Sequence, residues 1–439
     1  MAFVSLAVMV SRADVEIKFV TSADVGSELT FYVTSLTTGF TIDWGGGVVD
    51  TMSSTGTTAE VSGTVVGDTI VLACEDDIYS LDCSGCQLTD IDLTQPGGLL
   101  ALVCSDNELT SLYALYATSL RDLDCSGNQL TELSVSSLSN LRALNCSDNQ
   151  LTELDLSGCR QLEVLIYEDN AIGDVSLHSS AYLRGLWCDN NGKETISISG
   201  EDSLRSFSCS DNQLTEVDAA DLTVVEDFWC NNNQLDTLDL SSCTALNTLS
   251  CAGNGMKKLS IGGISSESPA YYVDCSNNAL TLSSLYPTKY VENYLYSPQD
   301  TIQLDFTEVE VKTAIDFSDL LCNASGTSVG SIAFYNSETD EELSSGVSSS
   351  KDYYASSGSV RFWETSAGMD VYAKITSSQY TDLEFVTSSF YVNYPEGIGP
   401  VEVEMDEESS DIIYNLQGQR VDNPLPGIYI KGGKKIIIK

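Results

Sequence analysis

The sequence predicts a mainly β chain: a solenoid of about ten 21-residue repeats with one parallel sheet, flanked by β-sandwich modules. Cysteines recur every 21 residues through the middle of the 439-residue chain, and an Asn follows nearly every one of them three residues later. On both sides of this region the spacing stops, and short runs rich in Val, Thr and Tyr alternate with Gly and Ser turns. A fixed period of this length indicates a solenoid, because each unit can bury its apolar face only against its neighbours.

Composition limits the possible partners. The 64 Asp and Glu residues outnumber the 20 Lys and Arg residues and give a net charge of −44. This charge argues against nucleic acid, since phosphate binding needs clustered Lys and Arg. The single His excludes any site that needs two imidazoles. Hydrophobic residues make up 42% of the chain, which predicts a folded protein, and no apolar run is long enough to predict a transmembrane helix.

The N-terminal part contains two predicted segments. Residues 1–13, MAFVSLAVMVSRA, resemble a truncated signal peptide that is cleaved before Asp14; the alternative is a first β-strand packed on a core. Residues 14–73 carry short β-type runs and predict a β-rich module that caps the solenoid. Within it, Ile42–Gly47 resembles the IDWGDG stretch of β-sandwich modules on bacterial surface proteins, but it lacks the second Asp.

Residues 74–285 contain the repeats, whose unit reads LxxLxCSxNQLTxLDLSxxxx. Each unit predicts one short strand, such as Leu123–Cys125, and stacked strands lie about 4.7–4.9 Å apart in a parallel sheet. The cysteine side chain points into the core, and the Asn bonds backbone groups of the turn that follows. The remainder of each unit predicts short extended or 3₁₀ segments. The predicted cysteine ladder is Cys83, Cys104, Cys125, Cys146, Tyr167 (in place of Cys), Cys188, Cys209, Cys230, Cys251 and Cys275. The predicted asparagine ladder is Asn107, Asn128, Asn149, Asn170, Asn191, Asn212, Asn233, Asn254 and Asn278.

Metal or redox chemistry is one interpretation of the ladder cysteines, and buried apolar packing is the other. Cys83 and Cys86 form the single CxxC pair of the ladder, and no His accompanies it. Bridging flat, in-register strands would strain a disulfide. We therefore expect free, buried thiols, and neither a metal nor a cofactor.

This pattern resembles the leucine-rich-repeat proteins of Bacteroidota surfaces and the cysteine-ladder repeats of internalin J-like proteins, over about residues 78–285. The resemblance implies a concave parallel sheet that binds a partner, with no catalytic residues. On that face the outward positions hold Val164, Ile166, Trp187 and Trp229, and the column before each strand holds Arg121, Arg142, Arg184 and Arg205. Exposed Trp indicates an interface. The alternatives are that the Trp side chains pack across strands and that the Arg side chains neutralise neighbouring acids.

Three segments follow the repeats. Residues 286–394 predict an immunoglobulin-like β-sandwich, and residues 395–410 predict an acidic linker. The stretches Tyr414–Val421, Gly427–Ile430 and Lys434–Lys439 give residues 411–439 a resemblance to the C-terminal sorting signal of type IX secretion. That resemblance implies export across the outer membrane and attachment to a surface glycolipid; the alternative is a final β-hairpin.

Together these patterns predict a secreted or cell-surface binding protein that recognises a protein partner, or a glycan, in adhesion or in host or cell interaction. Two alternatives remain open. One is a structural spacer or surface-layer component without a specific ligand. The other is a glycosidase with a carboxylate pair in a sandwich domain, although no nucleophile motif or metal cluster supports an enzyme.

Overall fold

The computed structural model describes most of residues 15–394 and the backbone of three strands near the C-terminus. Positions outside the description within that range are 36–38, 53–55, 75–77, 178–181, 199, 265–267, 286–287 and 324–325. The predicted signal peptide and the acidic linker also lie outside the described residues. The chain divides into two compact units, residues 1–280 with 284–300, and residues 281–283 with 301–439.

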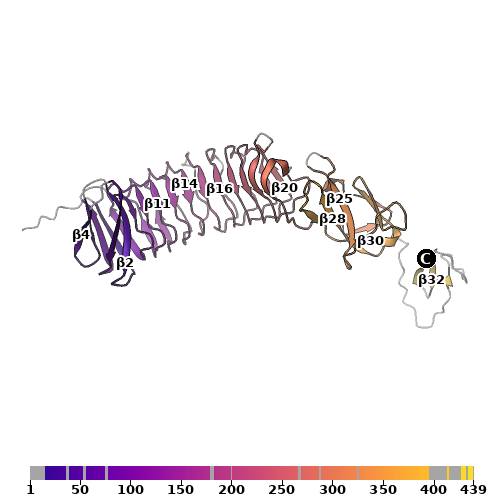
Figure 1. Ribbon diagram of the computed structural model, residues 1–439, viewed down its shortest axis with the longest axis horizontal. Helices are drawn as coiled ribbons and strands as arrows, with labels where there is room; N and C mark the ends of the chain where they lie inside the picture. The colour runs from indigo at the N-terminus through magenta and orange to yellow at the C-terminus, as the bar shows by residue number, and fades with distance from the viewer. Residues whose placement is uncertain are drawn as a thin grey trace, which may run out of the picture. The chain divides into compact units, whose positions relative to one another are not determined.

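A 13-stranded sheet runs through the first unit, and its solenoid part gains one parallel strand per repeat (Figure 1). In spatial order these strands are β7 (Ile78–Asp82), β9 (Ala101–Val103), β11 (Asp122–Asp124), β13 (Ala143–Asn145), β14 (Val164–Ile166), β15 (Gly185–Trp187), β16 (Ser206–Ser208), β17 (Asp227–Trp229), β19 (Thr248–Ser250), β21 (Ala270–Asp274) and β22 (Val291–Leu295). Most pair in a register that matches the repeat, as Leu123 of β11 does with Leu144 of β13. This arrangement confirms the predicted mainly β solenoid.

Alternation along each strand builds the core. In β11, Leu123 and the following Cys125 point inward and are buried, whereas Asp122 and Asp124 flank them on the other face of the sheet. Side chains of successive strand residues point to opposite faces, so a hydrophobic residue followed two positions later by Cys, or by Tyr167 in one repeat, fills the interior of each repeat. The fixed spacing therefore stacks like residues on like residues.

The turn after each strand depends on a left-handed backbone position. The residue two positions after each ladder residue has a positive φ of between 49° and 70°. Only Gly, Asn and Asp adopt this conformation at low cost. The column is accordingly Gly85, Asp106, Gly127, Asp148, Asp169, Asn190, Asp211, Asn232, Gly253 and Asn277. The turn thus explains why the motif reads Cys-Ser, then Asp, Asn or Gly, then Asn.

The N-terminal module joins both faces of the first repeat. One sheet contains β4 (Val49–Met52), β3 (Phe40–Asp43), β6 (Thr69–Cys74), β1 (Val15–Thr21) and β8 (Leu88–Gln95). Strands β2 (Glu28–Ser35) and β5 (Thr58–Thr64) extend the long sheet, because β2 pairs with β7 in antiparallel fashion. The rings of Phe19 and Phe31 lie 5.0 Å apart between the two sheets. At this end the solenoid therefore has no open strand edge.

The side of the solenoid away from the long sheet consists of turns and short extended segments. Strand β10 (Ser111–Tyr113) pairs with β12 (Glu132–Ser134), and β18 (Thr237–Leu240) pairs with β20 (Lys258–Ile261), both in parallel. The sequence predicts short extended or 3₁₀ segments on this side of the solenoid. Its described residues contain extended segments, as these strand pairs show.

The parallel sheet continues past residue 285, where the sequence predicts its end. Strand β22 pairs in parallel with β21, with Val273 opposite Tyr294. Beyond it, the Gln299 side chain accepts a bond from the Leu280 amide at 3.0 Å and donates to the Cys275 carbonyl at 2.8 Å. A Gln amide has the same donor and acceptor groups as Asn. Gln299 therefore takes the position of a ladder Asn, and the solenoid extends to about residue 300.

The second unit contains two sheets around an aromatic core. One sheet comprises β23 (Glu308–Glu310), β30 (Phe390–Asn393), β28 (Asp370–Ser377), β25 (Gly330–Asn336) and β29 (Glu384–Val386). The other comprises β24 (Ala314–Asp316), β27 (Ser359–Phe362) and β26 (Tyr353–Ser356). Phe334 contacts Phe362 edge-on at 5.0 Å between ring centroids, and both are fully buried. The immunoglobulin-like class of this module stays a prediction.

In the C-terminal tail, the backbone of β31 (Ile413–Tyr414), β32 (Gly427–Lys431) and β33 (Lys434–Ile438) forms a three-stranded antiparallel sheet. The side chains of the predicted sorting signal lie outside the described residues. Across the described part of the chain, no helix has the length and apolar character needed to cross a membrane.

Candidate partner-binding face

The predicted binding residues lie together on the outer face of the long sheet. Val164 and Ile166 belong to β14, Trp187 to β15 and Trp229 to β17, and all four are partly exposed. Ile166 is directly opposite Trp187 in the ladder, and Val164 is opposite Gly185. Adjacent strands lie about 4.8 Å apart, so Trp187 and Trp229, two strands apart, are separated by roughly 9.5 Å along the sheet. We name these four side chains the sheet-face patch.

Trp187 lies over Gly185 of its own strand. A Cβ atom on Gly185 would lie 2.4 Å from Cζ3 and 2.6 Å from Cη2 of the indole. The benzo half of the ring thus fills the space in which every other residue type would place a side chain. The two residues point to the same face because they are two positions apart on one strand. Gly185 therefore determines where the indole lies, which the repeat pattern alone does not reveal.

Small residues separate the two tryptophans. Ser208 lies in register between Trp187 and Trp229, and Ser250 follows Trp229. Although both serines are on the outer face, they are only 3% and 7% exposed. Their low exposure shows that neighbouring side chains cover them. The patch is therefore an alternation of large and small residues rather than a row of isolated rings.

The turn hydrogen bonding changes in the repeats around the tryptophans. In an ordinary repeat, Asp124 accepts bonds from the amide and hydroxyl of Ser126, at 3.0 and 2.6 Å. Trp187 cannot accept such bonds. Instead, Asp189 accepts from the Ser208 hydroxyl at 2.6 Å and from the Ser210 amide at 2.7 Å, both in the next repeat. In the ordinary repeat the accepting Asp124 precedes the ladder residue Cys125, whereas the accepting Asp189 follows the ladder residue Cys188.

The same change accompanies the second tryptophan. After Trp229, Asn231 accepts from the Ser250 hydroxyl at 2.8 Å and from the Ala252 amide at 2.9 Å. Burial raises the pKa of Asp189, whereas the bonds from Ser208 and Ser210 lower it. Asn231 makes equivalent bonds without a charge. The repeats that follow the two Trp repeats thus have their turn amides satisfied by acceptors of the Trp repeats.

One edge of the face carries the predicted arginines, all of them exposed. Arg142 forms an ion pair with Glu163 at 3.6 Å, and Arg205 pairs with Glu226. The geometry of Arg142 and Arg205 therefore fits the interpretation that these Arg side chains neutralise neighbouring acids. Arg121 and Arg184 make no ion pair with any described residue. The edge therefore keeps two cationic side chains available.

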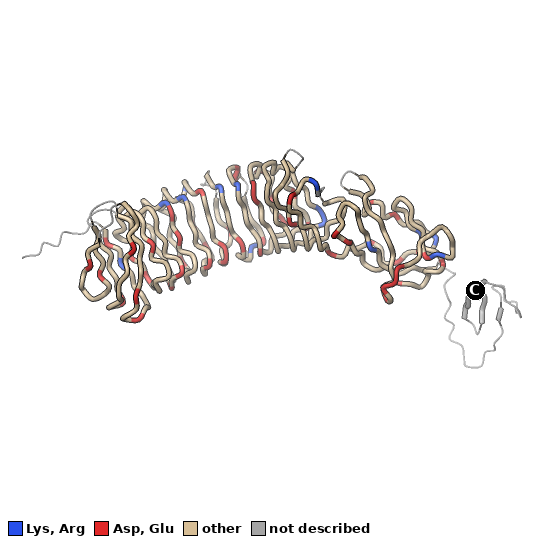
Figure 2. The backbone as a smooth tube through the Cα atoms, in the orientation of Figure 1, with Lys and Arg blue, Asp and Glu red and all other residues tan. Residues whose placement is uncertain are grey.

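The opposite edge is acidic. It carries the left-handed Asp residues of the turn, and Glu168 and Asp189 lie beside them. Burial, with the carboxylates of Asp189 and Asp169 close by, raises the pKa of Glu168. In Figure 2 the Lys and Arg positions of the solenoid lie mainly along one edge, with some Asp and Glu among them, whereas the charged positions of the other edge are mainly Asp and Glu. The sheet-face patch thus lies between edges of opposite charge.

Beneath the face, the asparagine ladder ties successive repeats together. The side-chain carbonyl of Asn128 accepts a hydrogen bond from the backbone amide of Leu109 in the previous repeat at 3.0 Å. Its amide donates to the Cys104 carbonyl of that repeat at 3.0 Å, and to Cys125 and Ser126 of its own. Amide bonds of this kind recur along the whole asparagine ladder: Asn107, Asn128, Asn149, Asn170, Asn191, Asn212, Asn233, Asn254 and Asn278.

The ladder cysteines are buried, and all 14 cysteines of the chain are free thiols. Burial raises the pKa of Cys146 to about 12. Such a thiol is almost entirely protonated at neutral pH, and the thiolate is the reactive form. Among the described residues, no three His, Cys, Asp or Glu side chains are grouped so that they could hold a metal ion. The cysteines act here as small apolar packing residues.

One repeat carries charge inside the solenoid. Tyr167 fills the missing cysteine position and is 2% exposed. The Lys193 ammonium, in a column otherwise filled by Leu, Ile and Met, lies 5.4 Å from the Tyr167 ring centroid and donates to the Gly173 carbonyl. Burial lowers the Lys193 pKa. In the same repeat, burial raises the pKa of Glu201 to about 7. The sequence places Lys193 at an apolar position, but only the structure shows that its side chain stays inside.

The chain is similar to known repeat proteins over parts of its length. A family model described as Leucine Rich repeats (2 copies) matches residues 118–158. The functional domain of InlJ from Listeria monocytogenes, which includes a cysteine ladder, is 20% identical, with 75% of this chain and 94% of that chain covered and a TM-score of 0.32. YopM, a leucine-rich effector protein from Yersinia pestis, is 21% identical, with 52% and 62% covered and a TM-score of 0.41. No curated protein has a significantly similar sequence.

The strands and turns form a solenoid of the leucine-rich-repeat kind, and the family model matches its residues 118–158. Leucine-rich-repeat proteins commonly mediate protein interactions. The repeats of this chain carry a ladder of buried cysteines.

Proposed function

We propose that the chain binds a protein partner through the outer face of its long sheet, centred on the sheet-face patch. The observation that carries this proposal is the position of two partly exposed Trp side chains between a basic and an acidic edge. Trp is enriched among interface residues that dominate binding energy. An aromatic and aliphatic centre with charged edges has the composition of a protein interface.

The charges define the partner's chemistry. Its central side chains are apolar or aromatic and pack against Trp187 and Trp229. The part that meets Arg121 and Arg184 is acidic, and the part that meets Glu168 and Asp189 is basic. Opposite charges at the two edges also fix the direction in which the partner lies across the strands, because the reversed orientation would place like charges together.

A double variant tests the proposal. Proximity labelling with the full chain identifies partners, and their affinity is then compared for wild type and Trp187→Ala/Trp229→Ala. Because a Trp hot spot contributes about 2 kcal/mol or more, we expect the affinity to fall by at least about 100-fold with unchanged circular dichroism.

The matched control is Tyr113→Ala/Tyr116→Ala, which removes two aromatic rings that are 53% and 67% exposed outside the long sheet. It should leave the affinity unchanged. An equal loss in both double variants, or no loss in the Trp variant, would refute the assignment of the partner to this face and favour a structural spacer.

We also propose a cellular location: the protein is exported and is either displayed at the cell surface or secreted. Its role there is adhesion or interaction with a host or another cell. The support is the resemblance to Bacteroidota surface repeat proteins and the likeness of residues 411–439 to a type IX sorting signal, which would also attach the chain to a surface glycolipid. Deletion of residues 411–439 should leave the protein in the periplasm. Normal surface display of the truncated chain would contradict this route.

A further inference from the structure

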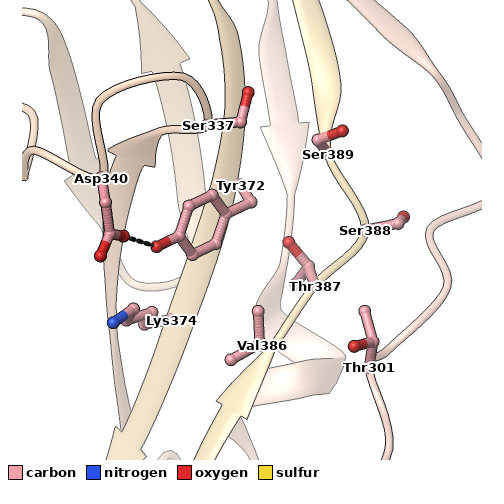
Figure 3. A pocket seen from close by; sticks show the side chains of 9 residues that line it. All are labelled: Thr301, Ser337, Asp340, Tyr372, Lys374, Val386, Thr387, Ser388 and Ser389. Carbon is pink, nitrogen blue, oxygen red and sulfur yellow. Dashed lines mark hydrogen bonds between the residues drawn. The ribbon is translucent and has the colours of Figure 1, made fainter.

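A shallow pocket of about 460 Å³ lies on the second unit, beside β28 (Figure 3). It exists because β28 changes partner along its length. Lys374 pairs with Val386 of β29, whereas Val371 pairs with Phe390 of β30. Between these two pairings the outer face beside Tyr372 is left uncovered. A volume of this size lies within the range of about 300–1,000 Å³ that is typical of small-molecule sites.

The segment that crosses this gap is fixed in place. The Thr387 amide donates to the Ala373 carbonyl at 2.9 Å, and the Thr387 hydroxyl accepts from the Ala373 amide at 2.8 Å. The next residue, Ser388, donates its amide to the Ile302 carbonyl at 2.8 Å. The chain thus leaves β28 at Thr387 and pairs on its other side with Ile302. The wall of the pocket is therefore held by backbone bonds.

Six of the nine lining residues carry a hydroxyl group, although more of the lining surface is apolar than polar. Thr301, Ser337, Ser388 and Ser389 carry one hydroxyl each, and Tyr372 carries its phenol. The Ser337 hydroxyl donates to the Asp370 carbonyl and can still accept, and the Ser388 hydroxyl accepts from the Leu304 amide and can still donate. Thr387 is buried, and its hydroxyl is bonded to the Ala373 amide. Asp340 is the single carboxylate and Lys374 the single ammonium among the lining residues. Neutral donors and acceptors outnumber charges, so the pocket suits a ligand with several hydroxyl groups and no net charge. With one carboxylate, the lining lacks the pair that ordinary glycoside hydrolysis requires.

The aromatic wall is preorganised. Tyr372 stacks on Tyr335 with ring centroids 5.6 Å apart and an interplanar angle of 24°. Its hydroxyl donates to Asp340, and that bond raises its pKa, so the phenol stays neutral at neutral pH. Lys374 lies 4.7 Å from the Tyr335 ring centroid and 3.4 Å from Glu384. Because the Tyr372 ring is already held in place, ordering it on ligand binding costs little free energy.

We propose that this pocket binds a neutral sugar ring, either a free sugar or the terminal residue of a glycan. The hydroxyl side chains exchange hydrogen bonds with the sugar hydroxyls, and Tyr372 offers an aromatic contact to its C–H surface. This site is separate from the sheet-face patch and does not depend on the protein-binding proposal.

Saturation-transfer NMR and calorimetry on the full chain test the proposal. The probes are the methyl glycosides of glucose, galactose, mannose, fucose and N-acetylglucosamine, with short oligosaccharides ending in the same sugars. Equal binding of a methyl glycoside and its oligosaccharide indicates recognition of one ring, and much tighter binding of the oligosaccharide indicates a glycan end.

Two variants locate the binding. Ser389→Trp fills the pocket from an exposed position, and Tyr372→Ala removes the aromatic wall. Each should weaken sugar binding by about tenfold or more. The matched control Ser359→Trp, exposed on the other sheet, and the Trp187→Ala/Trp229→Ala variant should bind as the wild type does.

If Tyr372→Ala fails to fold, Ser389→Trp alone decides the result. Absence of binding to every probe, or binding that Ser389→Trp leaves unchanged, would overturn the assignment.

Discussion

Glu201 gives the solenoid a pH-dependent stability. It occupies a column that neighbouring repeats fill with Ala117, Leu138, Cys159 and Leu222, and it is only 7% exposed. Burial is the main cause of its raised pKa, and the negative charge of Asp202 adds to it. Glu201→Gln keeps the size of the side chain and removes the titration.

The sign and size follow from the two pKa values of Glu201. The folded-state value is about 7, against 4.5 for an ordinary Glu, so the folded state binds the proton more tightly. The resulting stabilisation is fully present below about pH 4.5 and is lost as the pH rises through 7. At 1.36 kcal/mol per pKa unit the full loss is about 3 kcal/mol, with most of it between pH 5 and pH 8.

Urea denaturation of the full chain at pH 5, 6, 7 and 8, followed by circular dichroism, measures this loss. Many other carboxylates titrate in the same range, so the relevant quantity is the difference between wild type and Glu201→Gln. The free energy of unfolding of the wild type should fall more steeply, by roughly 2.5 kcal/mol between pH 5 and pH 8. Parallel curves would refute the reasoning. Glu216→Gln provides an exposed control in the next repeat.

Three further predictions concern other positions of the solenoid. Asn128→Ala leaves the buried Leu109 amide without its acceptor and removes one of the two donors to the Cys104 carbonyl, so it should lower the free energy of unfolding by about 2 kcal/mol or more in urea denaturation, whereas the exposed Asn140→Ala should lower it by less than about 1 kcal/mol. Gly185→Ala should displace the Trp187 indole and shift its fluorescence at little cost in stability; an unchanged emission spectrum would count against the contact. Lys193→Met should raise the free energy of unfolding by about 1–2 kcal/mol, since it removes a buried charge from an apolar column, and a destabilised variant would show that the bond to Gly173 outweighs that charge.

The repeat length and the two ladders are readable from sequence because they are periodic. A column of Cys or Asn at every 21st position has one physical explanation, an in-register stack in which each residue meets its own kind. The left-handed turn positions also recur with this period, as Asp, Asn or Gly two residues after each ladder residue. The sequence predicts the end of the solenoid too early, at residue 285, because Gln299 keeps the 21-residue spacing from Asn278 but is not an Asn.

The sequence by itself determined the fold of the repeats, since burial of a 21-residue unit against identical neighbours depends on spacing alone. The tertiary structure decided what departs from the repeat. It placed the Trp187 ring over Gly185, moved the turn acceptor to Asp189, and kept Lys193 inside the core. It also formed the pocket beside Tyr372 by exchanging strand partners. These features depend on contacts between residues without a common period, so they require the folded arrangement.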